Sequence, residues 1–129
     1  MKLLLDSNIL LAIAWREPSR YGNAIDQLLN SASYDKIASS ASIWEIAIKY
    51  RLGKLTLDRP IEDFPRFLQS LGCELLVVDH RHVVEDLVDQ PATKDPFDRL
   101  LLAQCQIEGM RLVTIDRALV RHPLAWNSA

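Results

Sequence analysis

Four carboxylates stand out by their positions in the sequence. Asp6 and Asp116 each directly follow a short apolar run, and Glu45 is a lone acid in an apolar stretch. Asp98 lies three residues after Asp95, so both can face the same way from the start of a helix. Clustered carboxylates raise one another's pKa, and hard divalent cations such as Mg²⁺ relieve that repulsion. The chemistry this set predicts is metal-dependent hydrolysis of phosphodiester bonds.

Each of these acids also has an ordinary structural explanation, and from the residues alone both explanations stay open. Asp6, Asp95 and Asp116 stand where helix N-caps are common, and Asp98 would interact favourably with a helix dipole. The acids converge only if the strands that precede Asp6 and Asp116 are neighbours in one sheet. Their carboxylates would then lie side by side at its carboxyl edge, where open α/β sheets bind ligands.

Other polar residues of the chain narrow the kinds of site and the enzyme classes that the sequence allows. Glu45 and Lys49 are four residues apart, a spacing that favours an intrahelical ion pair worth about 0.2–0.5 kcal/mol. His80 and His82 have no third ligand nearby in sequence, so a solvated helix start is expected there rather than a metal pair. Asn8 occupies the position at which a phosphatase of the haloacid dehalogenase type would carry a second acid, which argues against that class.

Strand-like and helix-like segments alternate along the chain, which predicts a parallel sheet covered on both faces. The expected strands are residues 3–5, 36–38, 74–78 and 111–115. The expected helices are residues 9–15, 20–30, 41–52, 60–71, a short one after residue 79 with an apolar stripe of Val83, Val84, Leu87 and Val88, then 95–108 and 116–121. The expected N-caps are Ser7 or Asn8, Ser19, Ser39 or Ser40, Asp79 and Asp95.

Length and composition favour one domain spanning residues 1–129, since 49% of the residues are hydrophobic. A net charge of -2 does not suggest a strongly basic nucleic-acid binder, although a local basic patch could serve.

Cys73 and Cys105 are isolated in apolar surroundings and are expected to be reduced core thiols of a cytoplasmic protein. The first apolar run ends at Asp6, too early for a secretory signal, and no segment could span a bilayer.

Five segments, in this order and spacing, resemble the PIN domain family, specifically the VapC-type toxins of bacterial toxin–antitoxin pairs. The segments are residues 4–8 (LLDSN), 42–49 (SIWEIAIK), 52–55 (LGKL), 95–104 (DPFDRLLLAQ) and 112–116 (LVTID). The run from 95 to 104 is the most specific of them. One departure is Thr93, because many members of the family carry His two residues before the acid that Asp95 matches.

The resemblance implies a three-layer α/β/α fold, with the first strand near the middle of a parallel sheet, and an active site that depends on Mg²⁺ or Mn²⁺. The acids that match the family's catalytic, metal-binding set are Asp6, Glu45, Asp98 and Asp116. Asp95 matches an additional acid of one subgroup and is a further candidate metal ligand. Asn8 and Thr114 are expected to have supporting roles.

By the same resemblance, the expected activity is endonucleolytic cleavage of RNA, with tRNA as a family-level target. The basic residues that could hold flanking phosphates are Lys49, Arg51, Lys54 and Arg99, and each could equally be a solvated surface charge.

A homodimer and a small antitoxin are the implied partners. The antitoxin groove would be formed by Ile61, Phe64 and Leu68, or by residues 50–55. The alternatives are a PIN-type nuclease that acts on structured RNA or DNA without an antitoxin, and a catalytically idle protein-binding module.

Overall fold

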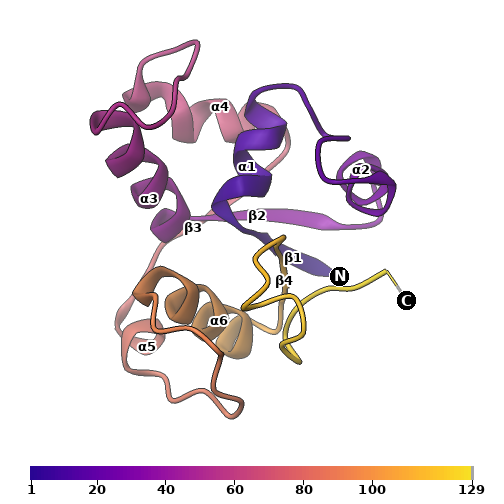
Figure 1. Cartoon of the computed structure of the whole chain (residues 1–129), viewed down its shortest axis with the longest axis vertical. Helices are drawn as coiled ribbons and strands as arrows, with labels where there is room; N and C mark the ends of the chain where they lie inside the picture. Colours follow the sequence, from indigo (N-terminus) through magenta and orange to yellow (C-terminus); the bar gives the residue numbers. More distant parts are fainter. Residues whose placement is uncertain (129) are drawn as a thin grey trace.

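The chain is organised around one parallel sheet, shown in the computed structural model of Figure 1, which describes residues 1–128. The strands of this part of the chain are β1 (Lys2–Leu5), β2 (Asp35–Ser39), β3 (Glu74–Leu76) and β4 (Arg111–Val113). They lie in the order β3-β2-β1-β4, and each neighbouring pair is parallel. The condition set out for the convergence of Asp6 and Asp116, that β1 and β4 are neighbours in one parallel sheet, is therefore met.

Helices cover both faces of the sheet. They are α1 (Ser7–Ala14), α2 (Asn23–Asn30), α3 (Ser40–Arg51), the short 3-10 turn η1 (Ile61–Asp63), α4 (Phe64–Ser70), α5 (His80–Val84) and α6 (Pro96–Glu108). In Figure 1, α1 to α4 lie above the sheet, and α5 and α6 lie below it. This is the three-layer α/β/α arrangement that was predicted. Over residues 1–128, none of the helices has the length and apolar character needed to cross a membrane.

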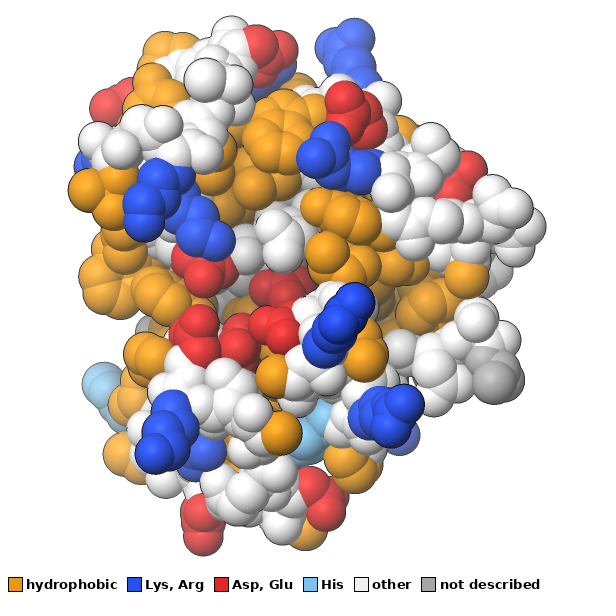
Figure 2. Space-filling view, in the orientation of Figure 1, with side chains coloured by type: hydrophobic (Ala, Val, Ile, Leu, Met, Phe, Trp, Pro, Cys, Tyr) orange, Lys and Arg blue, Asp and Glu red, His pale blue; other side chains and the backbone are white. Residues whose placement is uncertain are grey.

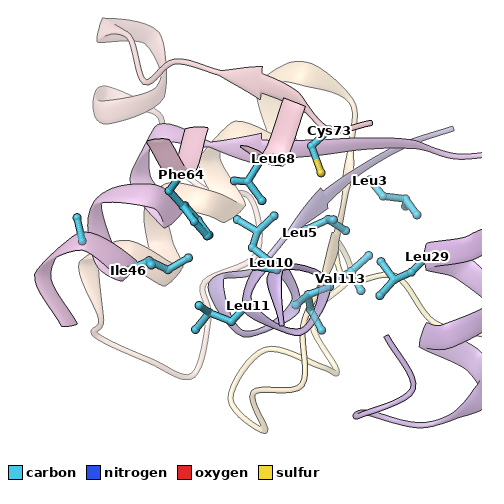
Figure 3. Close-up of a cluster of buried hydrophobic side chains, with 14 of the residues drawn as sticks. Leu3, Leu5, Leu10, Leu11, Leu29, Ile46, Phe64, Leu68, Cys73 and Val113 are labelled. Carbon is cyan, nitrogen blue, oxygen red and sulfur yellow. The ribbon is translucent and has the colours of Figure 1, made fainter. Parts of the chain in front are cut away.

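The core is divided in two by β1, because successive residues of a strand point to opposite faces. Leu3 and Leu5 pack on the side of α1 and α4, where Phe64 is fully buried (Figure 3). Leu4 packs on the opposite side with Leu102 of α6. All three leucines of β1 are fully buried, which explains why this strand reads as a continuous apolar run rather than an alternating one.

The register of β1 and β4 fixes where their following residues emerge. Leu5 pairs with Val113, and the amide of Asp6 donates to the Val113 carbonyl at 3.0 Å, which extends the ladder by one hydrogen bond. Both strands run in the same direction and end at the same level. Asp6 and the residues after Val113 are therefore placed together at the carboxyl edge of the sheet.

The far side of β4 is covered by the end of the chain. The Leu112 amide donates to the Leu124 carbonyl, and the Trp126 amide donates to the Leu112 carbonyl, both at 2.8 Å. Between these bonds, Leu112 and Ala125 form an isolated parallel bridge. The segment that leads there, predicted as a helix over residues 116–121, consists of turns, because only the Leu119 and Val120 amides donate back to Asp116. The helix prediction for this segment was wrong.

Most helix caps follow the sequence, but two predictions were wrong. Ser39, Asp79 and Asp95 cap their helices with side-chain oxygens, as expected. Asp6 itself caps α1, in place of the predicted Ser7 or Asn8. For α2, the predicted Ser19 cap is absent; the helix begins after Gly22, whose φ of 101° is a conformation that glycine adopts readily.

The apolar stripe predicted after residue 79 is not buried as a stripe. Helix α5 ends at Val84, because Glu85 adopts an extended conformation. Leu87 is buried, whereas Val83, Val84 and Val88 are exposed. The predicted stripe assumed that the helix continues as far as Val88. Because α5 ends at Val84, the four apolar residues do not share one helix face.

The predicted solvated helix start at residues 80–82 is correct for His80 and wrong for His82. The His82 side chain is fully buried, and its Nδ1 accepts a hydrogen bond from the Asp79 amide at 3.0 Å. The Asp79 carboxylate in turn accepts from the Arg81 amide at 2.9 Å. His82 is thus part of a capping box for α5 rather than a free histidine.

Two of the three residues offered as one antitoxin groove belong to the core. Phe64 and Leu68 are fully buried, so they cannot line a surface groove in this state, whereas Ile61 is 8% exposed and lines a hollow between α3 and α4. The alternative groove at residues 50–55 stays a prediction. Cys73 and Cys105 are buried and unpaired, in agreement with the expectation of core thiols.

We expect Leu68→Ala to lower the free energy of unfolding by about 2–5 kcal/mol, because Leu68 is fully buried and its removal leaves a cavity. The matched control Val84→Ala deletes apolar atoms from a side chain that is 78% exposed, and should change stability by less than about 0.5 kcal/mol. Urea unfolding followed by circular dichroism measures both. Equal effects of the two variants would contradict the assignment of Leu68 to the core.

Candidate active site

Asp6 lies at the centre of the candidate site and is 5% exposed. Its Oδ1 accepts from the Ser7 amide and its Oδ2 accepts from the Thr114 hydroxyl, both at 2.7 Å. Burial raises the pKa of Asp6, these two hydrogen bonds oppose the rise, and the charges of Glu45 and Asp116 add to it. Asp6 is therefore both the cap of α1 and a carboxylate held rigidly near other acids.

Glu45 reaches the site from α3 through Ser7. The Ser7 hydroxyl donates to Glu45 Oε1 at 2.5 Å and lies 3.5 Å from Asp6 Oδ1, so one serine links two acids 39 residues apart in sequence. The other oxygen of Glu45 is 3.9 Å from the ammonium of Lys49, as the i,i+4 spacing predicted. Sequence reasoning considered Ser7 only as a cap. A small hydroxyl residue directly after the strand-end acid was the available signal for its bridging position.

Thr114 positions the carboxylates on β1 and after β4. Its hydroxyl donates to Asp6 and accepts from the Asp116 amide at 3.1 Å. Asp116 is half-buried, and its Oδ1 accepts from the Ala118 amide at 2.9 Å. Thr114, predicted only as a supporting residue, thus fixes the two strand-end segments relative to one another.

Asp98 enters from the first turn of α6 and is 8% exposed. Its Oδ2 accepts a long hydrogen bond of 3.4 Å from Thr93, whose hydroxyl also accepts from the Asp95 amide at 3.1 Å. Asp95 is exposed and caps α6, with Oδ1 accepting from the Phe97 amide at 2.8 Å. Thr93, noted in the sequence as a departure from the family pattern, therefore still contacts the site.

The electrostatics indicate that the five acids converge. The pKa of Asp98 is raised to about 7, first by burial and then by the negative charges of Asp95, Asp6, Asp116 and Glu45. Figure 2 shows acidic side chains gathered in a hollow between the upper and lower halves of the molecule. An acid with this pKa is about half ionised at neutral pH, so the cluster carries charge that the protein leaves uncompensated.

The predicted phosphate contacts do not all lie in one place. Lys49 and Lys54 line the same groove as Glu45 and Asp95. Arg51 lines a different hollow, between α3 and α4, and Arg99 lines a third, between α5 and α6. The guanidinium of Arg99 also donates to Gln90 at 3.0 Å. The structure therefore brings the two lysines to the acids and directs the two arginines elsewhere.

The donor set fits a hard divalent cation. All of the converging side chains offer carboxylate oxygen, the ligand type of Mg²⁺ and Mn²⁺. Within residues 1–128, no group of three or more Asp, Glu, His or Cys side chains stands ready-spaced as a metal cage. The oxygens that cap helices and accept from Ser7 and Thr114 already have partners. Both oxygens of Asp6 accept hydrogen bonds, from the Ser7 amide and the Thr114 hydroxyl, so a cation there would share these oxygens with their donors.

Comparison with known proteins finds a matching family and a curated relative. Residues 3–123 match the model of the PIN domain family. A curated relative, Ribonuclease VapC16 of Mycobacterium tuberculosis, is 35% identical over 75 residues, which cover 55% of this chain and 53% of that protein. The matched region thus spans only about half the length of this curated relative.

A solved structure shares the fold. The crystal structure of VapBC2 from Rickettsia felis, bound to a DNA fragment from their promoter, has a chain with a TM-score of 0.60 and 17% sequence identity. The match covers 97% of this chain and 96% of that one. At this identity, the likeness concerns the arrangement of strands and helices.

In metal-free protein, Asp98 should make stability fall as the pH rises from 3.8 to about 7. Over this range the folded state keeps a proton that the unfolded state has lost, so rising pH favours unfolding. Asp98→Asn should remove this cost and raise the free energy of unfolding by on the order of 2 kcal/mol near about pH 8, with little gain near about pH 4.

Urea unfolding in EDTA at the two pH values measures the effect. Asp86→Asn is the matched control, because Asp86 is exposed on the loop after α5 and should give the same difference at both pH values. A gain from Asp98→Asn that is equal at low and high pH would rule out a raised pKa at this position.

Proposed function

The chain belongs to the PIN domain family, and on that premise we propose that it is a metal-dependent endoribonuclease, the toxin of a toxin–antitoxin pair. The observation that carries the proposal is the group of acids around Asp98 at the carboxyl edge of the sheet. Burial first, and then the charges of Asp95, Asp6, Asp116 and Glu45, raise the pKa of Asp98 to about 7. The printed name of the curated relative, a ribonuclease of VapC type, supports the activity.

Mg²⁺ or Mn²⁺ would be held by Asp6, Glu45, Asp98 and Asp116. Bound there, such a cation supplies an activated water and neutralises the charge that develops on the phosphate during in-line displacement. Asp95 adds negative charge beside Asp98 while its Oδ1 stays on the Phe97 amide, so it is an outlying member of the set.

The protein's own contribution is positioning. Ser7 and Thr114 hold Asp6 and orient Glu45, and the β1–β4 register keeps Asp6 beside the segment that carries Asp116. Preorganised ligands of this kind need no rearrangement at the moment of reaction, which is the main source of catalytic stabilisation. Asn8, half-buried in the first turn of α1, has a supporting position in the same segment.

Lys49 and Lys54 are the basic residues best placed to hold phosphates that flank the scissile bond, because they share a groove with Glu45. Arg51 and Arg99 would contact RNA only farther from the acids. A cation held by the acids would neutralise the scissile phosphate, so a net charge of -2 is compatible with an RNA substrate.

The proposal includes the partners that the toxin class implies: RNA as substrate, with tRNA as one target class, a small antitoxin and a second copy of the chain. The solved structure of similar fold is a VapBC2 assembly, which supports an antitoxin partner. A cytoplasmic location and a single domain over residues 1–129 complete it. The full set of acids in one hollow argues against a catalytically idle module.

Purified protein free of antitoxin should cleave RNA with Mg²⁺ or Mn²⁺, and EDTA should abolish cleavage. Asp6→Asn should lower the cleavage rate by on the order of 100-fold or more, because it removes a central oxygen ligand. Asp86→Asn, an exposed carboxylate away from the site, should cleave normally. Gel analysis of a broad RNA set measures all three. Equal cleavage by the Asp6→Asn protein would refute the assigned mechanism.

Metal binding has a readout that needs no activity. A divalent ion at about 100 times its dissociation constant should stabilise the folded state by about 2.7 kcal/mol, since it binds only there. Asp98→Asn should reduce this gain, whereas Asp86→Asn should keep it. Thermal unfolding with and without Mn²⁺ measures the effect, and an unchanged melting temperature at millimolar Mn²⁺ would count against a metal site.

A further inference from the structure

An aromatic pair, made of the exposed Trp44 and the partly buried Phe97, lies next to two of the acids in sequence. The ring centroids of Trp44 and Phe97 are 5.5 Å apart, and their planes meet at 63° in an edge-to-face contact. Trp44 immediately precedes Glu45 on α3, and Phe97 immediately precedes Asp98 on α6. The Trp44 side chain is 61% exposed, so it contributes little to the core. A large aromatic ring that stays in contact with water at this position is available to a ligand.

Phe97 also lines a groove of about 450 Å³ between α3 and α6, which two of the acids, Glu45 and Asp95, line as well. We call it the α3–α6 groove. Its lining residues are Glu45, Ile48, Lys49, Leu52, Lys54, Asp95, Pro96 and Phe97. The groove therefore combines an apolar and aromatic wall, carboxylates and two lysines, within a volume that suits a small ligand group.

The carboxylates that line the α3–α6 groove disfavour an anionic ligand and leave room for an uncharged one. A phosphate placed against Glu45 and Asp95 would be repelled, whereas an uncharged, flat nucleobase has apolar faces that match Phe97, Leu52 and the adjoining Trp44. The lysines then lie within reach of the backbone phosphates on either side of that base. Aromatic rings combined with nearby cations are the usual means of binding unpaired nucleotides.

Resting on the proposed ribonuclease function, we infer that the α3–α6 groove holds an unpaired nucleobase next to the scissile phosphate, stacked against the Trp44–Phe97 pair. The stacked base must be unpaired, because a base within a continuous duplex has no free face to stack. Trp44 is a positioning residue in this scheme. It contacts the flanking base while the acids act on the neighbouring phosphate.

The test uses an oligoribonucleotide that the protein cleaves, with single nucleotides replaced in turn by abasic ones that keep every phosphate. In the parent protein, an abasic nucleotide at one position beside the cut should raise KM about tenfold. Trp44→Ala should raise KM about tenfold on the intact RNA, and the abasic position should then add no further loss. The kcat values should agree within about twofold.

Two controls separate stacking from general damage. Trp44→Phe keeps an aromatic face and should recover most of the affinity. Val88→Ala changes another exposed apolar side chain, 85% exposed and remote in sequence from both rings, and should match the parent. Equilibrium binding of the labelled oligonucleotide to each variant in EDTA gives the same comparison without cleavage.

The outcomes distinguish this inference from the proposed function. Cleavage by the parent, with KM and abasic penalties unchanged in Trp44→Ala, would overturn the stacking site and leave the ribonuclease in place. RNA binding that shows the Trp44 dependence without any cleavage would overturn the enzyme and keep the site. Loss of affinity for a protein partner in Trp44→Ala, with RNA binding unaffected, would make the aromatic pair a protein-docking surface instead.

Discussion

The structure depends on holding several mutually repelling carboxylates at one edge of a parallel sheet. The β1–β4 register fixes the backbone of Asp6 beside the segment of Thr114 and Asp116, and hydroxyl donors hold Asp6 in place. Fully buried leucines on both faces of β1 make this framework rigid. Burial and, after it, repulsion from the neighbouring acids both raise the pKa of Asp98.

Capping and site chemistry turn out to be compatible roles. Asp6, Asp95 and Asp116 each use Oδ1 to accept from a nearby backbone amide, as helix or turn caps do. In Asp6 the second oxygen accepts from Thr114, so this carboxylate serves two segments at once. The capping explanation of these acids, which competes with the metal-binding one in the sequence, is therefore correct, and it leaves the proposed metal-binding role open to the same side chains. A carboxylate that caps a helix already has a fixed rotamer, so binding a metal ion would cost it little further side-chain entropy.

The features predictable from sequence are those with short-range signals. Apolar runs revealed the strands and the interior place of β1, and Ser39, Asp79 and Asp95 marked helix starts correctly. The link from Ser7 to Glu45 was out of reach, because it joins residues that only the tertiary fold brings together. His82 was misjudged for a similar reason: it follows two polar residues at a helix start, but α6 packs against α5, and His82 is a buried capping partner.

The pairing of the chain's end with Leu112 has a consequence for how molecules associate. It hides the outer hydrogen-bonding groups of β4 at Leu112, so another chain cannot add a strand there. The opposite border, β3, spans only three residues, which also limits strand addition. With both lateral borders blunted, the sheet offers little opportunity for the edge-to-edge pairing by which open sheets aggregate.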